Sequence, residues 1–476
     1  MTVDRAAPGP LRQQLAEQLR AAIRRGALQP GEPLPSSRRL AEQVGASRGL
    51  VVDCYEQLLA EGYLEASGGS GTRVAAGVAS SRPAPPPDET ASEAVPAGAI
   101  NFAYGIPDLA SVPLSDWLWA LTEAARTIPA TDLDDEGPAG SPRLREVLTA
   151  YHRRVRAGCA AAGDAVVVGG FRHGLALVLA ALARHGTTHV ALEDPGPREH
   201  DQIARRAGLT VVAVPVDDDG LDVAGLRRSP ARAVLVTPAH QCPTGAVLSP
   251  DRRRELMAWA EAVDGVILED DYDAEFRYDR QPVGSLHGLD PDRVVALGSL
   301  SKTFAPALRI GWLLAPPAYR PAILEEKRLT TRGVPGLDQL ALAHLIESGR
   351  FDRHLRRMRT LYAARRETLA AAVEADLPGL RLTGLAAGCH ALLRLPPGVA
   401  EAEVVAGARA RSVIVRGLSD YRLTSEGVPP ALVLGFGNTN ETRIRAGIRA
   451  LAEVLKTQRS ESRSSARTPS SIMHIM

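Results

Sequence analysis

The sequence predicts an α/β protein in which a small helical domain precedes a larger domain with a mainly parallel sheet. Three observations lead to this prediction. Residues 11–75 show three closely spaced helical patterns and a hairpin pattern, residues 76–98 are rich in Ala, Pro and Ser, and residues 165–315 alternate short apolar runs with helical stretches. From about residue 340 the chain is mostly helical with two strand candidates, which predicts a smaller C-terminal α+β subdomain.

Length and composition place the chain among globular proteins. Its 476 residues, 45% of them hydrophobic, suffice for two or three domains with a large buried core. Arginines interrupt the first 30 residues, and no later run reaches the ~18 apolar residues that a membrane span needs, so we expect a cytoplasmic protein. The four cysteines lack CxxC spacing, which argues against disulfides and a zinc site, and we expect no metal.

The N-terminal segment has the order of elements of a winged helix-turn-helix. Apolar residues recur every four positions over residues 11–23 and predict an amphipathic helix. A second helix is expected to begin at Ser36 or Ser37 and to end at Gly45, and a third to begin at Ser47. The stretch "YLEASGGSGTRVA" alternates on both sides of a glycine cluster and predicts a hairpin, the wing.

Charge is concentrated in this segment. The whole chain has a net charge of +1, but residues 5–48 contain eight arginines and three glutamates, a balance of +5. A short basic face on a neutral scaffold is typical of a nucleic-acid-binding domain. Solvated surface charge is the alternative interpretation.

Lys302, in "GSLSKTFAPALRIGW", is one of only three lysines in a chain with 53 arginines. Lysine, unlike arginine, can lose its proton and form a Schiff base with a carbonyl. Taken alone, Lys302 could also be a lysine that remains by chance in a sequence whose coding favours arginine. Its neighbours favour a chemical role, because Ser299, Ser301 and Thr303 supply hydroxyls and Arg309 is a fixed cation that could hold a phosphate.

The stretch "VILEDDYDAEF" ends a predicted strand with three acids and a tyrosine. A carboxylate at the carboxyl end of a parallel strand lies where such sheets bind ligands and can keep a pyridine nitrogen protonated, and Asp270 is our choice for it. Tyr272, two residues on, could hydrogen-bond a phenolate oxygen on the same ring. Taken alone, the acidic cluster could equally be a solvated strand end.

The stretch "VVVGGFRHG" combines a strand, two glycines and a helical run. The amides of Gly170, Phe171 and Arg172 would then point at a phosphate near a helix N-terminus, although a Gly-Gly pair by itself is more often just a turn. A lysine amine, a carboxylate for a pyridinium, a hydroxyl donor and a phosphate cradle together indicate a pyridoxal 5′-phosphate site. No other common cofactor needs that set.

Longer motifs carry a family resemblance. "SLSKTFAPALRIGW", "TPAHQCPTG" and "EDDYDAEFRY" resemble the fold type I aminotransferases, and the last two resemble the branch of that fold in MocR-type transcription regulators. The stretch "GALQPGEPLPSSRRLAEQVGASRGLVVDCYEQLLAEGYLEASGGSGTRV" is similar to the GntR winged helix. We therefore expect a winged helix at 1–75, a linker at 76–98, an aminotransferase-like domain at 99–456 with its small subdomain from about 340, and a disordered tail at 457–476.

The resemblance also implies roles for single residues. Lys302 would carry the internal aldimine, Asp270 would pair with the pyridinium nitrogen, and Tyr272 would contact the ring oxygen. Ser299 and Arg309 would hold the phosphate. The family usually forms homodimers that bind operator DNA and respond to the cofactor or to an amino-acid-like amine. The positions matching DNA contacts are Arg38, Ser47, Arg48, Gly49, Gly69 and Gly71, with Arg39 left open.

Three departures from the family pattern bear on function. Pro197 follows "EDPG" where the family usually has an aromatic residue that stacks on the pyridine, and Cys242 precedes "PTG" where aminotransferases have asparagine. The late strand "ALVLGFG" lacks the arginine that binds a substrate carboxylate in many aminotransferases, with Arg416 and Arg422 only nearby. The missing arginine disfavours both an enzyme and an amino-acid effector, and it favours sensing of pyridoxal phosphate itself.

We therefore expect a pyridoxal-phosphate-dependent, DNA-binding transcription regulator rather than an enzyme. One rival hypothesis is a working aminotransferase whose winged helix is incidental. A second is a regulator whose pocket has lost the cofactor and binds another small molecule.

Overall fold

The computed structural model describes residues 9–67, 71–76, 96, 98–134, 137–278, 283–331, 333–384, 387–424 and 429–465. The chain divides into two compact units, Met1–Ala94 and Val95–Met476, and each is described by itself. The division falls inside the segment expected to be a linker, most of which lies outside the described residues.

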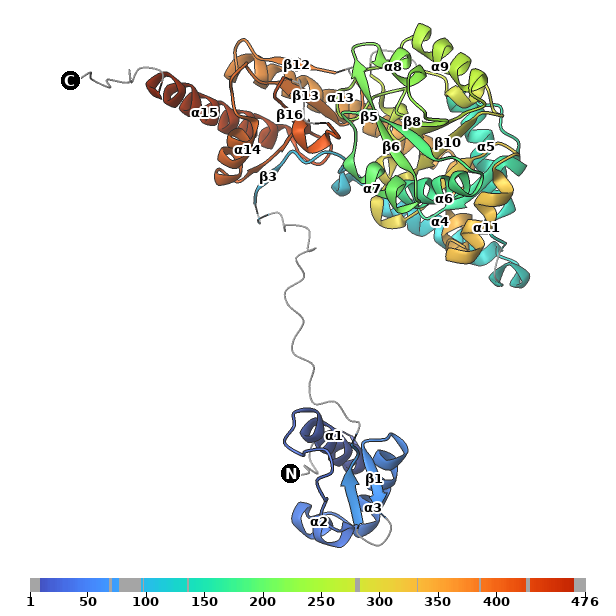
Figure 1. Cartoon of the computed structure of the whole chain (residues 1–476), viewed down its shortest axis with the longest axis vertical. Coiled ribbons are helices and arrows are strands. Elements are labelled where there is room, and N and C mark those ends of the chain that lie inside the picture. Colours follow the sequence, from blue (N-terminus) through green and yellow to red (C-terminus); the bar gives the residue numbers. More distant parts are fainter. Residues whose placement is uncertain are drawn as a thin grey trace, which may run out of the picture. The chain divides into compact units, whose positions relative to one another are not determined.

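The N-terminal unit has the three helices and the hairpin that the sequence predicts. The hairpin strands pair antiparallel, with Leu64 opposite Val74. The elements are α1 (Leu11–Arg24), α2 (Ser37–Val44), α3 (Arg48–Ala60), β1 (Leu64–Ser67) and β2 (Gly71–Val74) (Figure 1).

Two serine caps and one glycine shape the turn between α2 and α3. The Ser36 and Ser47 hydroxyls accept hydrogen bonds from the backbone amides three residues on. Gly45 has φ 65°, a left-handed conformation that ends α2 and redirects the chain into α3. This unit also has a hydrophobic core of its own, which includes Leu15, Leu19, Val51, Leu58, Leu64 and Val74.

The larger unit is built on an eight-stranded sheet of order β4-β11-β10-β9-β8-β5-β6-β7. The strands from β10 through β6 are parallel to their neighbours, whereas β11 is antiparallel to both β10 and β4 and the short β7 is antiparallel to β6. The strands are β4 (Ala165–Val168), β5 (His189–Asp194), β6 (Thr210–Asp217), β7 (Gly220–Leu221), β8 (Ala233–Val236), β9 (Val266–Asp271), β10 (Val294–Ser299) and β11 (Gly311–Leu314).

Helices cover both faces of this sheet, which explains why its strands read as continuous apolar runs. Leu268 on β9 packs into the core beneath α6 and α11, whereas the adjacent Ile267 packs into the core on the opposite face with α8 and α9 (Figure 1). The helices before the small subdomain are α4 (Leu114–Thr127), α5 (Pro142–Arg156), α6 (Phe171–Arg184), α7 (Arg198–Arg206), α8 (Val223–Arg227), α9 (Pro250–Ala262), α10 (Leu300–Thr303), α11 (Arg320–Thr330) and α12 (Gly336–Glu347).

The C-terminal part forms a second, four-stranded antiparallel sheet of order β12-β13-β16-β15, as expected for an α+β subdomain. β14 pairs instead with β3, which lies near the start of the larger unit. The elements are β3 (Ile100–Asn101), α13 (Arg350–Asp376), β12 (Arg381–Thr383), β13 (His390–Arg394), α14 (Glu401–Ala410), β14 (Val413–Ile414), β15 (Arg416–Gly417), β16 (Ala431–Gly435) and α15 (Glu441–Ser465).

Helix α15 differs from the sequence prediction, which placed a disordered tail from residue 457. The helix continues to Ser465. Leu455 is the last buried apolar residue of this helix. One turn later, the Gln458 amide donates a hydrogen bond to Glu403 on α14 at 3.3 Å, which holds the first polar turn of the helix against α14. Residues 466–476 lie outside the described residues.

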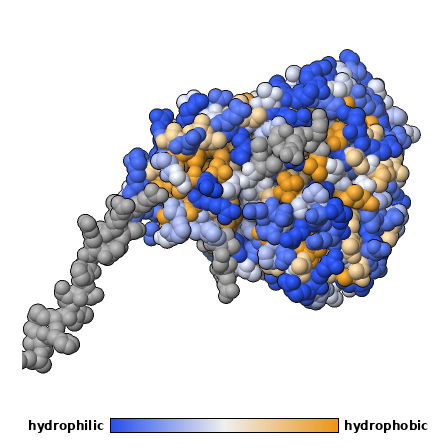
Figure 2. Space-filling view, turned by 90° about the horizontal axis from the view of Figure 1, so that it is seen from above, coloured by the Kyte–Doolittle hydropathy of each residue, from blue (hydrophilic) through white to orange (hydrophobic). Residues whose placement is uncertain are grey.

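The described surface of the larger unit is mixed. Figure 2 shows one face on which hydrophobic patches lie among mostly hydrophilic side chains. On α4, Leu114 and Leu118 are 63% and 64% exposed. Among the described residues, no helix is both long and apolar enough to cross a membrane.

Candidate cofactor site and DNA-binding surface

A pocket of about 560 Å³ opens at the carboxyl ends of β9 and β10. Ligands bind at this edge in open α/β sheets because loops from neighbouring parallel strands converge there. The pocket brings together seven of the eight residues that the sequence predicts to bind the cofactor: Lys302, Asp270, Tyr272, Ser299, Arg309, Phe171 and Arg172.

Lys302 lies in α10, the single turn that follows β10. Its Nζ donates a hydrogen bond to the Gly105 carbonyl and lies 5.4 Å from the centroid of the Tyr104 ring. A Cβ at Gly105, which has φ +87°, would lie 2.6 Å from that Nζ. The segment at Tyr104 and Gly105 therefore orients the amine, and the positive φ of Gly105 favours glycine at this position.

The other two lysines lack such a setting. Lys327 is fully buried in α11, and its amine donates to the Pro138 carbonyl. Lys456 is exposed on α15 and pairs with Glu453 at 2.9 Å. Lys302 is the lysine that lines the pocket.

Asp270 is buried at the end of β9. Burial, reinforced by the nearby carboxyls of Asp271 and Asp273, raises the pKa of Asp270 well above its ordinary value, and Lys302 opposes the shift. A carboxylate in such a position is stabilised by a cationic partner. The site therefore suits a ligand that presents a protonated ring nitrogen to Asp270.

Tyr272 and Cys242 form a neighbouring part of the wall. The Tyr272 hydroxyl donates to the backbone carbonyl of His240 at 2.7 Å. Burial raises the pKa of the Cys242 thiol, so this residue presents a neutral thiol, a weaker hydrogen-bond donor than the asparagine amide of aminotransferases.

The end of the pocket at Ser299 and Arg309 has the groups for a phosphate. The Ser299 hydroxyl accepts from the Ser301 amide at 3.1 Å and donates to the Ser301 hydroxyl at 3.0 Å. The Arg309 guanidinium donates to the Gly169 carbonyl at 2.8 Å, and a Cβ at Gly170, which caps α6, would lie 3.4 Å from it. Two hydroxyls, a guanidinium and a helix N-terminus are a common phosphate-binding set.

Together these groups fit pyridoxal 5′-phosphate: an amine, a carboxylate for the ring nitrogen, a tyrosine hydroxyl and a phosphate cradle line one pocket. Thr303, expected beside the amine, is buried and does not line it. Gly170 also does not line it but lies against Arg309.

Several residues of the pocket wall could not be predicted from the sequence. Tyr104 and Gly105 come from "NFAYGIP", which has no strand-end pattern that could have indicated them. Aromatic surface comes from Tyr104, Phe171 and Tyr421 rather than from position 197, where Pro197 lines the wall.

The two arginines near the late strand have different positions. Arg416 lies on β15, beside the arginine-free β16, and lines the pocket. Arg422 instead lies 3.9 Å from Asp194 and donates to Thr424. Arg416 is therefore the one of the two that could meet a bound ligand.

The N-terminal unit presents the expected DNA-contacting positions on its surface. The Arg38 side chain on α2 is 84% exposed and lies 3.6 Å from Glu42. Ser47, Arg48 and Gly49 are exposed at the N-terminus of α3. Gly71 begins β2 with φ +99°. Gly69 lies outside the described residues, and Arg39 is exposed on α2.

Comparison with known proteins gives the same two parts. Residues 99–442 match the family described as aminotransferase class I and II, and residues 11–74 match the gntR family of bacterial regulatory proteins. An archaeal alanine:glyoxylate aminotransferase superposes with a TM-score of 0.70 at 24% identity over 76% of this chain and 91% of that chain, a likeness of fold alone.

Two curated relatives span nearly the whole chain. The HTH-type pyridoxine biosynthesis transcriptional regulator PdxR of Corynebacterium glutamicum is 35% identical over 91% of this chain and 93% of its own length. A probable rhizopine catabolism regulatory protein, MocR, of Rhizobium meliloti is 32% identical over 95% of both chains. The chain therefore belongs to the MocR-type DNA-binding transcription regulators, in which a GntR-family helix-turn-helix domain precedes an aminotransferase class I and II domain.

Proposed function

We propose that this regulator senses pyridoxal 5′-phosphate in the pocket of its larger unit and changes its affinity for operator DNA in response. The observation that carries the proposal is the meeting of Lys302, Asp270 and Arg309 in one pocket, on a fold that binds this cofactor in aminotransferases. The name of the relative PdxR, a regulator of pyridoxine biosynthesis, supports the same ligand.

In this proposal each residue has a distinct task. The Lys302 amine attaches the ligand covalently, Asp270 holds a proton on the ring nitrogen, and Tyr272 donates to the ring oxygen. The phosphate is held by Ser299, Arg309 and the amides of Gly170, Phe171 and Arg172 at the start of α6. When bound, pyridoxal phosphate supplies an aldehyde and an electron-withdrawing ring.

We also propose that the regulator acts as a homodimer. Operator DNA is commonly read as two half-sites by two copies of a helix-turn-helix, which requires a partner subunit. Exposed leucines on α4, Leu114 and Leu118, with Leu109 just before it, provide apolar surface that a second copy could cover. Ligand binding would then shift the population of dimers whose two DNA-binding domains match the operator spacing.

A second candidate ligand is an amino-acid-like amine with a carboxylate, and Arg416 is the observation that favours it. Its side chain lines the pocket and is 60% exposed, 3.9 Å from Asp420, so it could exchange that partner for a ligand carboxylate. In a gel-shift titration, an amino acid that changes operator affinity in wild type but not in Arg416→Ala would support this candidate. A response to pyridoxal phosphate alone in both chains would exclude it.

The first test is the visible absorption spectrum of the full chain after incubation with pyridoxal phosphate and removal of unbound ligand, because free pyridoxal phosphate is itself yellow. We expect a yellow absorption band in wild type and none in Lys302→Ala, because attachment needs that amine. Lys456→Ala is a matched control, since its amine is exposed outside the pocket, and it should keep the band. A band that persists in Lys302→Ala, or its absence from wild type, would refute the cofactor assignment.

The second test links the pocket to DNA. Promoter fragments from genes of pyridoxal phosphate synthesis are titrated with the wild-type chain, with and without the ligand. We expect operator affinity to change in wild type and to stay constant in Lys302→Ala. If the ligand changes the operator affinity of neither chain, the sensor proposal is contradicted, but the DNA-binding assignment is not affected.

A further inference from the structure

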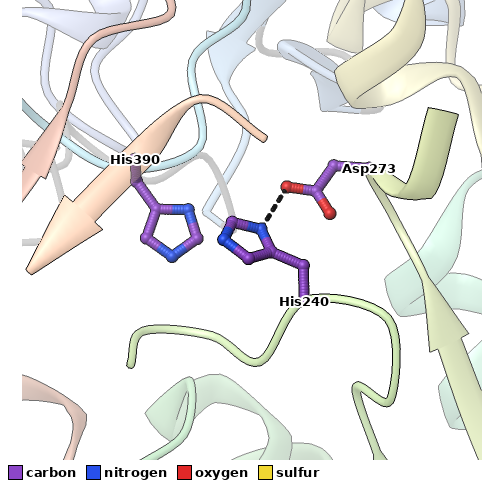
Figure 3. A group of neighbouring side chains, drawn as sticks. All are labelled: His240, Asp273 and His390. Atoms are coloured by element: carbon purple, nitrogen blue, oxygen red, sulfur yellow. Dashed lines mark hydrogen bonds and ion pairs between the residues drawn. The ribbon is translucent and has the colours of Figure 1, made fainter. Parts of the chain in front are cut away.

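His240, Asp273 and His390 form a buried cluster beside the cofactor pocket (Figure 3). His240 follows β8, Asp273 follows β9, and His390 begins β13 of the four-stranded sheet. One ligand atom of each side chain lies within 4.8 Å of the others, and no residue of the three is more than 2% exposed.

The cluster leaves polar atoms unsatisfied. The Asp273 carboxylate lies 2.9 Å from Nδ1 of His240, but Nε2 of His240 is buried without a hydrogen-bond partner among the described residues. His390 has at most one weak partner, the backbone carbonyl of Pro243, so at least one of its ring nitrogens is unpaired as well. Buried nitrogens without partners cost free energy, and such groups call for a bound ion or water.

The backbone makes room for the three side chains. A Cβ at Gly388, which has φ +63°, would lie 2.2 Å from the Asp273 carboxylate and 2.6 Å from Nδ1 of His240. Any other residue at this position would push the cluster apart. The glycine thus holds these groups in a space that a side chain would otherwise fill.

The three groups also offer the kinds of ligand atom that a transition metal prefers. Two imidazoles and one carboxylate, all nearly fully buried, converge with ligand atoms within 4.8 Å of one another. A bound cation would stabilise the buried carboxylate and coordinate imidazole nitrogens.

We propose that His240, Asp273 and His390 bind a divalent transition-metal ion, with Zn²⁺ as the best match. Two neutral imidazoles and one carboxylate are a common ligand set for this ion. Tetrahedral ligands about 2.0 Å from zinc lie roughly 3.3 Å apart, so the three ligand atoms, which now lie within 4.8 Å of one another, must move closer together when the ion binds. The fourth position would be taken by water.

Such an ion would tie the two sheets of the larger unit together. It would join the ends of β8 and β9 to β13, next to the wall residue Tyr272, which already donates to the His240 carbonyl. The inference concerns a site outside the pyridoxal phosphate pocket and does not depend on the cofactor. It is therefore tested without added cofactor.

The experiment uses the full chain, equilibrated with Zn²⁺, desalted and analysed for metal by mass spectrometry. We expect about one retained ion per wild-type chain and affinity weaker by about tenfold or more in His390→Gln and His240→Gln. His152→Gln is the matched control, because His152 is also buried with both ring nitrogens unpaired but is not in the three-residue group. It should retain zinc as wild type does.

A measurement on wild type alone keeps the test independent of how the variants fold. Co²⁺ in place of zinc should give the visible absorption of a low-symmetry four-coordinate site, and zinc should displace it. Failure of wild type to retain zinc, the absence of this absorption, or equal retention by wild type and His390→Gln would each overturn the proposal. The unpaired nitrogens would then be assigned to buried water.

Discussion

Lys302 owes its setting to residues nearly two hundred positions away in the chain. Its amine meets the Gly105 carbonyl and the Tyr104 ring, while the carboxylate and the phosphate-binding groups come from the ends of β9 and β10 and the start of α6. In the proposed function, the Lys302 amine carries the covalent chemistry, and the surrounding side chains determine where the ligand lies.

Arg309 gives the first prediction at the residue scale. Its guanidinium lies between Gly169 and Gly170 and can hold a phosphate with two parallel hydrogen bonds, which an ammonium group cannot do. Arg309→Lys should therefore weaken pyridoxal phosphate binding by roughly 10- to 100-fold, the effect of losing one charge-assisted hydrogen bond. Absorbance titration measures this, with the exposed Arg126→Lys as the control. Unchanged affinity would remove Arg309 from the phosphate site.

Glu193 gives a pH-dependent prediction. Its buried carboxyl faces Thr237 and Gln241, and burial raises its pKa from 4.5 to about 7. Because the folded state holds this proton more tightly than the unfolded state, stability is lost as the pH rises from 4.5 to about 7. Glu193→Gln has no proton to lose, so it should escape this loss, which is at most about 3 kcal/mol.

Urea unfolding at pH 5 and pH 8 checks the Glu193 prediction. The wild-type chain should lose more stability between the two pH values than Glu193→Gln does. Glu453→Gln, an exposed carboxyl on α15, is the control and should follow wild type. An equal loss in wild type and Glu193→Gln would show that this carboxyl does not titrate in the window.

Helix α3 gives the prediction at the scale of elements. Arg48 is exposed at its first turn, where side chains of a recognition helix meet base edges and phosphates. Arg48→Ala should abolish specific operator binding, lower the dependence of binding on salt by about one counterion, and leave the absorption spectrum with pyridoxal phosphate unchanged.

Gel-shift titrations at several salt concentrations measure the Arg48 effect. Arg126→Ala, which removes an exposed arginine from the larger unit, serves as the charge-matched control and should bind operator as wild type does. Retained specific binding by Arg48→Ala would contradict the assignment of α3 as the recognition helix.

The sequence predicts most elements well because local signals define them. Every strand expected between residues 165 and 315 is present, since each apolar run is bounded by turn residues, and most of these strands are buried on both faces. Local signals cannot predict which segments that are distant in the sequence come into contact. The spacing of His240, Asp273 and His390 in the chain gives no hint that β13 lies beside the end of β9, and no strand-end pattern marks Gly105. Helix α15 continues past its last apolar residues, where the Gln458 amide donates a hydrogen bond to Glu403 on α14.

At the scale of the whole molecule, we expect the N-terminal unit to bind DNA and the larger unit to bind the proposed ligand. The N-terminal unit has its own hydrophobic core, so residues 1–94 should fold alone and unfold cooperatively. This fragment should bind DNA more weakly than the full chain, and pyridoxal phosphate should not alter its binding. Thermal unfolding and gel-shift titration test both points. Ligand-sensitive binding by the fragment would show that the larger unit is not the sensor.

The chain has only three lysines, and this small number limits its side reactions with free pyridoxal phosphate. Pyridoxal phosphate is an aldehyde, and exposed lysine amines on most proteins add to its carbonyl without specificity, with loss of water. Of the two lysines other than Lys302, Lys327 is fully buried and Lys456 is exposed on α15. Because nearly all basic side chains on the surface are arginines, the free aldehyde has almost no lysine other than Lys302 to react with. If the proposed function is right, the protein would respond to ligand bound in its pocket with few side reactions on its own surface.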